Sequence, residues 1–167
     1  MQRQLLVLRH GKSSWADAFT DDWERPLTER GERDAVRVGE FLRRQGLVPD
    51  LIVSSDAVRA QSTAQRAADA SGYSGTITLS SLLYHATPAA ITGVINGVIN
   101  GAPNAVHRLM IVGHNPGLED LVSQLTRQQI GLSTATLVHI ELPVEHWHDA
   151  GAATAGSLLG FWNPRDL

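Results

Sequence analysis

The sequence predicts a three-layer α/β/α domain built around a mostly parallel central sheet of about six strands. Short apolar runs alternate along the chain with segments of helical periodicity, which is the pattern of strand–helix units. The clearest run, residues 5–8, is continuously apolar, as expected for a strand that is buried on both faces. A length of 167 residues favours one full core, so we expect residues 1–167 to form a single domain.

The first strand–helix unit has recognisable ends. The strand over residues 5–8 is followed by a polar loop over residues 12–26, and Thr28 can cap a helix with its side chain. This helix is expected to end near Gly46, because glycine is common just beyond helix C-termini. Its predicted buried face carries apolar residues at helical spacing, namely Ala35, Val38 and Leu42.

The middle of the chain repeats this order with shorter strands. A strand over residues 51–53 precedes an alanine-rich helix over residues 57–70, for which Asp56 is the expected N-cap. A weaker strand over residues 77–79 precedes a helix that Thr87-Pro88 opens as cap and first residue. The apolar residues of that helix are spaced i, i+3, i+4, i+7 and i+8, at Ile91, Val94, Ile95, Val98 and Ile99.

The last part of the chain predicts three more strands and one helix. Residues 109–112 form a buried type of strand, and Asn115-Pro116 supplies a cap and a first residue for a helix over residues 118–125. Residues 136–142 alternate like a partly exposed strand, and residues 158–162 form the final strand. We expect these last two strands to be antiparallel at one edge of the sheet.

Composition excludes several classes of protein. Hydrophobic residues make up 43% and charged residues 19%, which indicates a globular chain, and a net charge of −3 argues against general nucleic-acid binding. The absence of cysteine excludes disulfides, thiolate nucleophiles and cysteine-ligated zinc. Because no signal peptide or apolar stretch of about 20 residues is visible, we expect no membrane partner and a cytoplasmic protein.

Two predicted strands end in a histidine. His10 follows the strand over residues 5–8, and His114 follows the strand over residues 109–112. Ligands of open α/β sheets bind beyond the carboxyl ends of the strands, and parallel strands bring these ends to one edge. The two imidazoles are therefore expected to lie close together in a ligand site.

Two arginines are expected at the same edge. Arg9 precedes His10, and Arg59 falls in the first turn of its helix, where a cation opposes the helix dipole unless an anion binds there. Guanidinium groups bind phosphoryl oxygens bidentately, and a neutral histidine can attack phosphorus to form a phosphohistidine that water then cleaves. This set of residues predicts phosphoryl transfer without a metal ion or other cofactor.

These residues occur in motifs that resemble a known family. Arg9-His10-Gly11 resembles the signature of the histidine phosphatase superfamily, in the branch that includes phosphoglycerate mutases. The chain looks most like the SixA-type phosphohistidine phosphatases of that branch. The matching motifs, in order, are Leu-Arg-His-Gly-Lys-Ser-Ser-Trp at 8–15, Arg-Pro-Leu-Thr at 25–28, Ser-Ser at 54–55 with Arg-Ala at 59–60, Leu-Tyr at 83–84, Val-Gly-His-Asn-Pro-Gly at 112–117 and Pro-Arg-Asp-Leu at 164–167.

The resemblance implies a phosphoglycerate mutase-like fold over residues 1–167 as one histidine phosphatase domain. It implies His10 as the nucleophile, with Arg9, Arg59 and His114 around the phosphoryl group. Lys12 and Ser13 fall in the loop beside the pocket as possible substrate contacts. The implied partner is a phosphorylated substrate, possibly a protein that carries phosphohistidine.

One departure from the family concerns the general acid. Many relatives place a glutamate after the third strand, whereas residues 82–87 here read Leu-Leu-Tyr-His-Ala-Thr and contain no carboxylate. His85 is the possible substitute, because an imidazole can donate a proton near neutral pH. A missing acid disfavours alkyl phosphates most and phosphohistidine least, since the latter can lose an already protonated nitrogen.

Alternatives stay open at this point. The chain could act on small phosphate esters, or it could be a phosphate- or phosphoprotein-binding module without turnover; a mutase would normally need the missing acid. A nucleotide-binding protein lacks support, because neither glycine-rich phosphate motif occurs. In a strand, His146 and His148 would lie on the same face and could bind a metal ion together. Because they fall in an expected loop, no metal site is predicted there.

Overall fold

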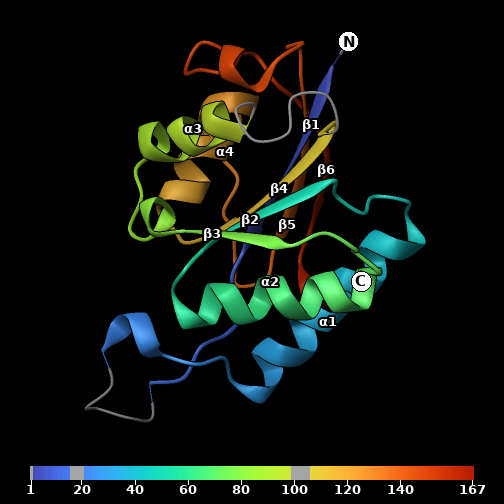
Figure 1. The fold of residues 1–167 in the computed structure, drawn as a ribbon, viewed down its shortest axis with the longest axis vertical. Coiled ribbons are helices and arrows are strands. Elements are labelled where there is room, and N and C mark those ends of the chain that lie inside the picture. The colour runs from blue at the N-terminus through green and yellow to red at the C-terminus, as the bar shows by residue number, and fades with distance from the viewer. Residues whose placement is uncertain (1, 16–20, 99–105) are drawn as a thin grey trace.

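The computed structural model describes residues 2–15, 21–98 and 106–167, and it has the predicted three-layer α/β/α architecture (Figure 1). The sheet has six strands in the order β3-β2-β4-β1-β5-β6. Their bounds are β1 Arg3–Arg9, β2 Leu51–Ser55, β3 Ile77–Ser80, β4 Arg108–Gly113, β5 Leu137–Leu142 and β6 Ser157–Trp162.

Two pairs of helices cover the two faces of the sheet. In Figure 1, α1 (Glu29–Arg44) and α2 (Val58–Ser71) lie below the sheet, and α3 (Pro88–Gly97) and α4 (Gly117–Thr126) lie above it. Each pair closes one apolar core, so the central strands are covered on both sides. None of these helices, among the residues described, is long and apolar enough to cross a membrane.

The strand directions agree with the sequence prediction. The strands β3, β2, β4 and β1 are mutually parallel, and β5 runs antiparallel to both β1 and β6. At the centre, Leu8 pairs with Val112 and Arg9 with Gly113, so β1 and β4 end side by side. This register brings His10 and His114 to the same edge of the sheet.

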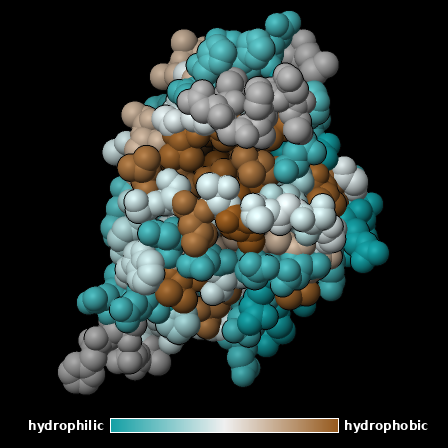
Figure 2. Space-filling model, in the orientation of Figure 1, coloured by the Kyte–Doolittle hydropathy of each residue, from teal (hydrophilic) through white to brown (hydrophobic). Residues whose placement is uncertain are grey.

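Strand β3 is one of the two edges of the sheet. It faces the viewer in Figure 1, and Figure 2 shows apolar residues on this face above the largely hydrophilic helices α1 and α2. The side chain of Leu79 in β3 is 46% exposed. The edge strand is short, which limits the backbone that it offers for pairing with another chain.

Two of the predicted helix caps are wrong. Thr28 caps α1 by accepting from Gly31 N, as predicted. Asp56 does not cap α2, because its Oδ1 accepts from Trp23 Nε1 at 3.2 Å, and Ser55 Oγ accepts from Ala57 N instead. Asn115 does not cap α4: the N-cap position is Pro116, Asn115 Nδ2 donates to the carbonyl oxygen of Leu132 at 2.8 Å, and Asn115 Oδ1 has no partner among the described residues.

Strand β5 is more buried than its alternating sequence suggested. Only Glu141 is partly exposed, because Leu137 packs into the core beneath the sheet and Val138 into the core above it. His139 is also buried, and its Nε2 lies 3.0 Å from Gln4 Oε1 on β1. The predicted position Ile99 in the helix after Thr87 lies outside the described residues, and α3 ends at Gly97.

The loop after β1 packs directly on the start of α1. A Cβ atom added to Gly31 would overlap the carbonyl oxygen of Lys12 and lie 2.9 Å from its amide nitrogen. A Cβ atom added to Gly11 would lie 2.8 Å from the carbonyl oxygen of Gly31. The two glycines therefore allow two backbones to meet where the residues after His10 leave the sheet.

We expect Gly31→Ala to lower the free energy of unfolding by about 1–3 kcal/mol, because backbone atoms of Lys12 must move. Gly93→Ala is the matched control, since an added Cβ in α3 meets nothing within 4 Å. That control should raise stability by about 0.5–1 kcal/mol, because alanine restricts the unfolded chain. Urea denaturation measures both values, and equal stability of the two variants would contradict this packing.

Candidate active site

A pocket of about 340 Å³ lies at the carboxyl ends of the central parallel strands. It contains all seven residues that the sequence singled out as a site. Its lining residues are Arg9, His10, Lys12, Ser13, Trp15, Asp22, Arg25, Arg59, His85, His114, Asn115 and Thr134.

The backbone of His10 is fixed from both sides. Its amide donates to the carbonyl oxygen of Gly113 at 3.1 Å, and its own carbonyl accepts from the amide of Ala135 at 2.9 Å. These bonds continue the ladders of β1 beyond its last residue. The imidazole is therefore held at a defined position, and only 7% of the residue is exposed.

One ring nitrogen of His10 forms a hydrogen bond within the protein, and the other is available to a substrate. Nδ1 lies 2.7 Å from the carbonyl oxygen of Gly11, which can only accept, so we assign the ring proton to Nδ1. Nε2 then carries the lone pair. This is the tautomer that a nucleophilic histidine needs.

The surroundings keep this imidazole neutral. Burial lowers the pKa of His10 to about 4, against an ordinary value of 6.5; the bond to Gly11 opposes this effect, and the positive charges of Arg59, Arg9 and Arg25 add to it. A neutral ring at physiological pH retains the lone pair on Nε2.

His114 faces His10 across the pocket. The two ring centroids are 5.1 Å apart, and His114 Nε2 lies 2.8 Å from Ser55 Oγ at the end of β2. Burial lowers the pKa of His114 to about 3, with contributions from His10 and Arg59. Its buried Nδ1 has no hydrogen-bond partner among the described residues.

The two predicted arginines are anchored at their tips. Arg9 Nη1 donates to the carbonyl oxygen of Leu132 at 2.8 Å. Arg59 Nη1 donates to the carbonyl oxygen of Asp22 at 2.6 Å, and its Nη2 donates to Asp22 Oδ2 at 2.9 Å. The Nε atoms of both arginines are buried and, like His114 Nδ1, have no partner in the described part of the chain. Buried nitrogen atoms without a partner on three of the four central side chains, two of them guanidinium donors, fit a site that an anion completes.

The remaining predicted residues occupy the rim. Lys12 and His85 are exposed, whereas Ser13 is buried and its hydroxyl accepts from Arg25 Nη2. His85 has a backbone φ of 52°, a conformation that residues other than glycine rarely adopt. Its ring centroid lies 6.4 Å from that of His114. The strained backbone thus presents an imidazole at the mouth of the pocket.

The sequence analysis gave no site role to three residues of this pocket region, although two of them, Arg25 and Tyr84, stand in the family motifs. Asp22, at the start of the short helix η1 (Asp22–Glu24), accepts from Arg25 Nη1 at 2.8 Å and from the hydroxyl of Tyr84 at 2.6 Å. The spacing of Asp22 and Arg25 fits an i, i+3 ion pair, but it lies in an irregular loop. Only the fold brings this loop against Arg59, so periodicity could not place it.

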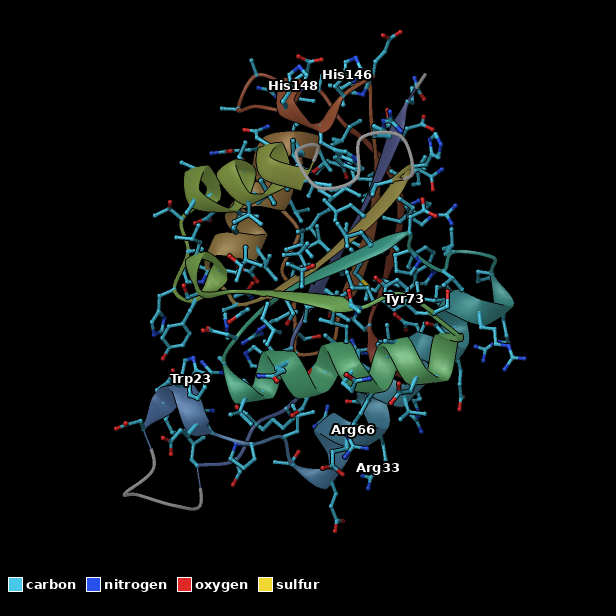
Figure 3. The ribbon with its side chains drawn as sticks, viewed as in Figure 1. Trp23, Arg33, Arg66, Tyr73, His146 and His148 are labelled. Carbon is cyan, nitrogen blue, oxygen red and sulfur yellow. The ribbon has the colours of Figure 1, made fainter. Side chains whose placement is uncertain are left out.

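The His146–His148 pair lies elsewhere. Figure 3 shows both residues at one end of the molecule and Trp23, the neighbour of Asp22, toward the other end. The two rings stack with centroids 5.2 Å apart, and His148 Nε2 lies 3.3 Å from Asp149 Oδ1. Within the described residues, no group of three or more histidine, aspartate or glutamate side chains is placed to hold a metal ion.

Sequence comparison identifies the family. The model of the histidine phosphatase superfamily (branch 1) matches residues 5–83. An uncharacterized chloroplastic protein of Arabidopsis thaliana is 31% identical over 163 residues, which cover 91% of this chain and 72% of that protein. A 2,3-bisphosphoglycerate-dependent phosphoglycerate mutase of Bifidobacterium longum is 43% identical over 72 residues, but these cover 42% of this chain and only 29% of the mutase. The chain belongs to the histidine phosphatase superfamily.

Solved structures agree with this assignment. A putative phosphohistidine phosphatase SixA from Agrobacterium tumefaciens is 26% identical, with a TM-score of 0.77 and coverage of 97% of this chain and 98% of that chain. A putative SixA from Nakamurella multipartitia has a TM-score of 0.83 at 23% identity, covering 98% of this chain and 97% of that chain. The predicted phosphoglycerate mutase-like fold of the SixA type is confirmed, and family and fold together support a phosphatase mechanism.

Because the pKa of His10 is about 4 and that of His114 about 3, both imidazoles should stay neutral from about pH 8 down to about pH 5.5. Histidine NMR signals of the phosphate-free protein test this, and the His10 signal should move only as the pH approaches 4. The urea-unfolded chain is the control, since its histidines should titrate near about 6.5. A His10 midpoint near 6.5 in the folded protein would contradict the proposed tautomer and charge.

Proposed function

We propose that this protein is a metal-independent phosphatase that forms a phosphohistidine intermediate on His10 and acts on phosphohistidine in proteins. The observation that carries the proposal is the neutral His10 ring, with Nδ1 tied to Gly11 and Nε2 free beside Arg9, Arg59 and His114. A module that only binds phosphate needs the cations but has no need of a preset nucleophile.

The proposed reaction has two steps. In the first, the lone pair of His10 Nε2 forms a bond to phosphorus, and the bond to the leaving group breaks with its electron pair. In the second, water attacks phosphorus, the P–N bond breaks with its electron pair returning to Nε2, and both protons of the water leave with the product as dihydrogenphosphate. Arg9, Arg59 and His114 stabilise the charge on the phosphoryl oxygens in both steps. The guanidinium groups of Arg9 and Arg59 supply the positive charge that a metal ion provides in other phosphatases.

The chemistry of the leaving group favours phosphohistidine. Asp22 is the one carboxylate among the described lining residues. Burial alone would raise the pKa of Asp22, but hydrogen bonds from Tyr84, Arg25 and Arg59 outweigh it and hold that pKa well below its usual range. An ionised carboxylate cannot protonate an alkoxide, whereas an imidazole that is already protonated leaves as a neutral ring.

Small phosphate esters are the second candidate substrates, and His85 is the observation that favours them. Its imidazole lines the pocket, and Nε2 lies 3.8 Å from Asp22 Oδ2, so it is placed to donate a proton at the mouth. We propose His85 as the donor for such esters, with Lys12 and Ser13 as further substrate contacts. A single catalytic domain over residues 1–167 and a cytoplasmic location stay predictions from the sequence.

We expect His10→Gln to lose phosphatase activity by on the order of 10³-fold or more, because no other group at its position can take the phosphoryl group. His146→Gln, outside the pocket lining and at the other end of the molecule from Trp23 (Figure 3), should keep the wild-type rate. EDTA should leave the wild-type rate unchanged. Initial rates on a phosphohistidine-bearing protein domain and on a panel of small phosphate esters measure all three effects.

The same rates test the substrate. The phosphohistidine domain should have the highest kcat/KM, and His85→Gln should slow alkyl esters more than phosphohistidine. A dominant rate on one ester would overturn the proposed substrate but keep the proposed mechanism. Strong inhibition by EDTA would overturn metal independence, and an active His10→Gln variant would overturn the mechanism itself.

A further inference from the structure

Asp22 places a negative charge in a pocket that is otherwise built for an anion. It lies among Arg9, Arg25 and Arg59, and its side chain is 37% exposed. If the carboxylate served only to hold the arginines, burial behind them would be enough. Its exposed position at the mouth instead puts it within reach of whatever is attached to a bound phosphoryl group.

The carboxylate still has hydrogen-bonding capacity. An ionised carboxylate offers about four acceptor positions. Three are occupied, by Arg25 Nη1 at 2.8 Å, by Arg59 Nη2 at 2.9 Å and by the hydroxyl of Tyr84 at 2.6 Å. Within the described part of the chain, no fourth donor lies within hydrogen-bond distance of Asp22, and His85 Nε2 stays at 3.8 Å.

The protonation state of Asp22 decides what it can do in the reaction. Burial would raise its pKa, but the hydrogen bonds from Tyr84, Arg25 and Arg59 lower it well below the usual range, so the group stays ionised. Burial, together with the hydrogen bond to Asp22, raises the pKa of Tyr84, which remains a donor. Asp22 can therefore accept a hydrogen bond from a substrate but cannot give it a proton.

We propose that Asp22 is a specificity-determining residue, which accepts an N–H of the leaving group and thereby selects phosphoramidates such as phosphohistidine over phosphate esters. The inference rests on the proposed function and deepens it, because it identifies how the pocket distinguishes two classes of substrate. The group that Asp22 recognises is the protonated second nitrogen of a phosphorylated imidazole.

The step balances without a general acid. The lone pair of His10 Nε2 forms the new N–P bond, and the P–N bond of the substrate breaks with its electron pair going to the substrate ring. That ring already carries a proton on its second nitrogen, so it leaves as neutral imidazole. Asp22 accepts a hydrogen bond from this N–H throughout and stabilises the cationic ring in the substrate complex and in the transition state.

The carboxylate of Asp22 has the opposite effect on the leaving group of a phosphate ester. Its bridging oxygen gains negative charge as the P–O bond breaks, and a nearby carboxylate repels that charge. A second anionic group on the substrate would be repelled in the same way. One fixed charge therefore favours nitrogen leaving groups and disfavours oxygen leaving groups.

The test compares two small substrates, N-phosphoimidazole and p-nitrophenyl phosphate. The p-nitrophenolate group of the second substrate leaves without protonation, so neither substrate needs a general acid. Asp22→Asn removes the charge and keeps the size of the side chain. It should lower kcat/KM for phosphoimidazole by on the order of tenfold or more, the value of one charge-assisted hydrogen bond. The rate on p-nitrophenyl phosphate should fall much less or rise. Asp21→Asn, which removes the same charge from an exposed neighbour outside the lining, is the matched control and should change neither rate.

Each outcome either supports or contradicts the role of Asp22 in substrate selection. A fall in the phosphoimidazole-to-ester ratio for Asp22→Asn, and for Asp22→Ala where the first variant does not fold, supports the proposal. An equal loss on both substrates would overturn the proposal and mean that Asp22 only positions Arg25 and Arg59. Unchanged rates on both substrates would also overturn it. Wild-type protein that hydrolyses neither substrate, nor the phosphohistidine-bearing domain, would overturn the proposed function itself, which is a separate result.

Discussion

The ring of His10 has one nitrogen committed to the carbonyl oxygen of Gly11, 2.7 Å away, and the chemistry of the pocket depends on that bond. It places the proton on Nδ1 and leaves the lone pair of Nε2 for the substrate. Backbone bonds from His10 to Gly113 and from Ala135 to His10 hold this residue in place at the end of β1. Burial then keeps the ring neutral, so geometry and charge both come from the position of one residue at the end of a central strand.

The charges around His10 determine which groups the pocket binds. Three arginines line the pocket, and they would repel one another without a counter-ion. Asp22 supplies part of that counter-charge, since it binds Arg25 and Arg59 through separate oxygens. It also leaves the arginines with unused donors for a phosphoryl group. The balance of one carboxylate against several guanidinium groups allows the pocket to bind an anion while it stays sensitive to the charge of the leaving group.

The sequence predicted most of the fold because β1, β2 and β4 carry buried-strand patterns and Thr28 and Thr87 have clear cap positions. It also predicted that His10 and His114 meet, since both follow parallel strands. Asp22, Arg25 and Tyr84 were missed because they lie in irregular segments that have no periodicity. Their positions depend on contacts across the chain, such as the bond between Asp22 and Tyr84 over 62 residues. The caps assigned to Asp56 and Asn115 were wrong: Asp56 accepts from Trp23, and Asn115 lies before the N-cap position and donates to Leu132.

In the proposed mechanism, His10 Nε2 carries the phosphoryl group during turnover. The most direct measurement mixes protein with a phosphohistidine-bearing domain, quenches with alkali within the first turnovers, and locates protein-bound phosphate by mass spectrometry. Phosphate is expected on His10, stable in alkali and lost in acid, and it should be absent from the His10→Gln variant. Phosphate on another residue, or none during rapid turnover, would contradict the mechanism.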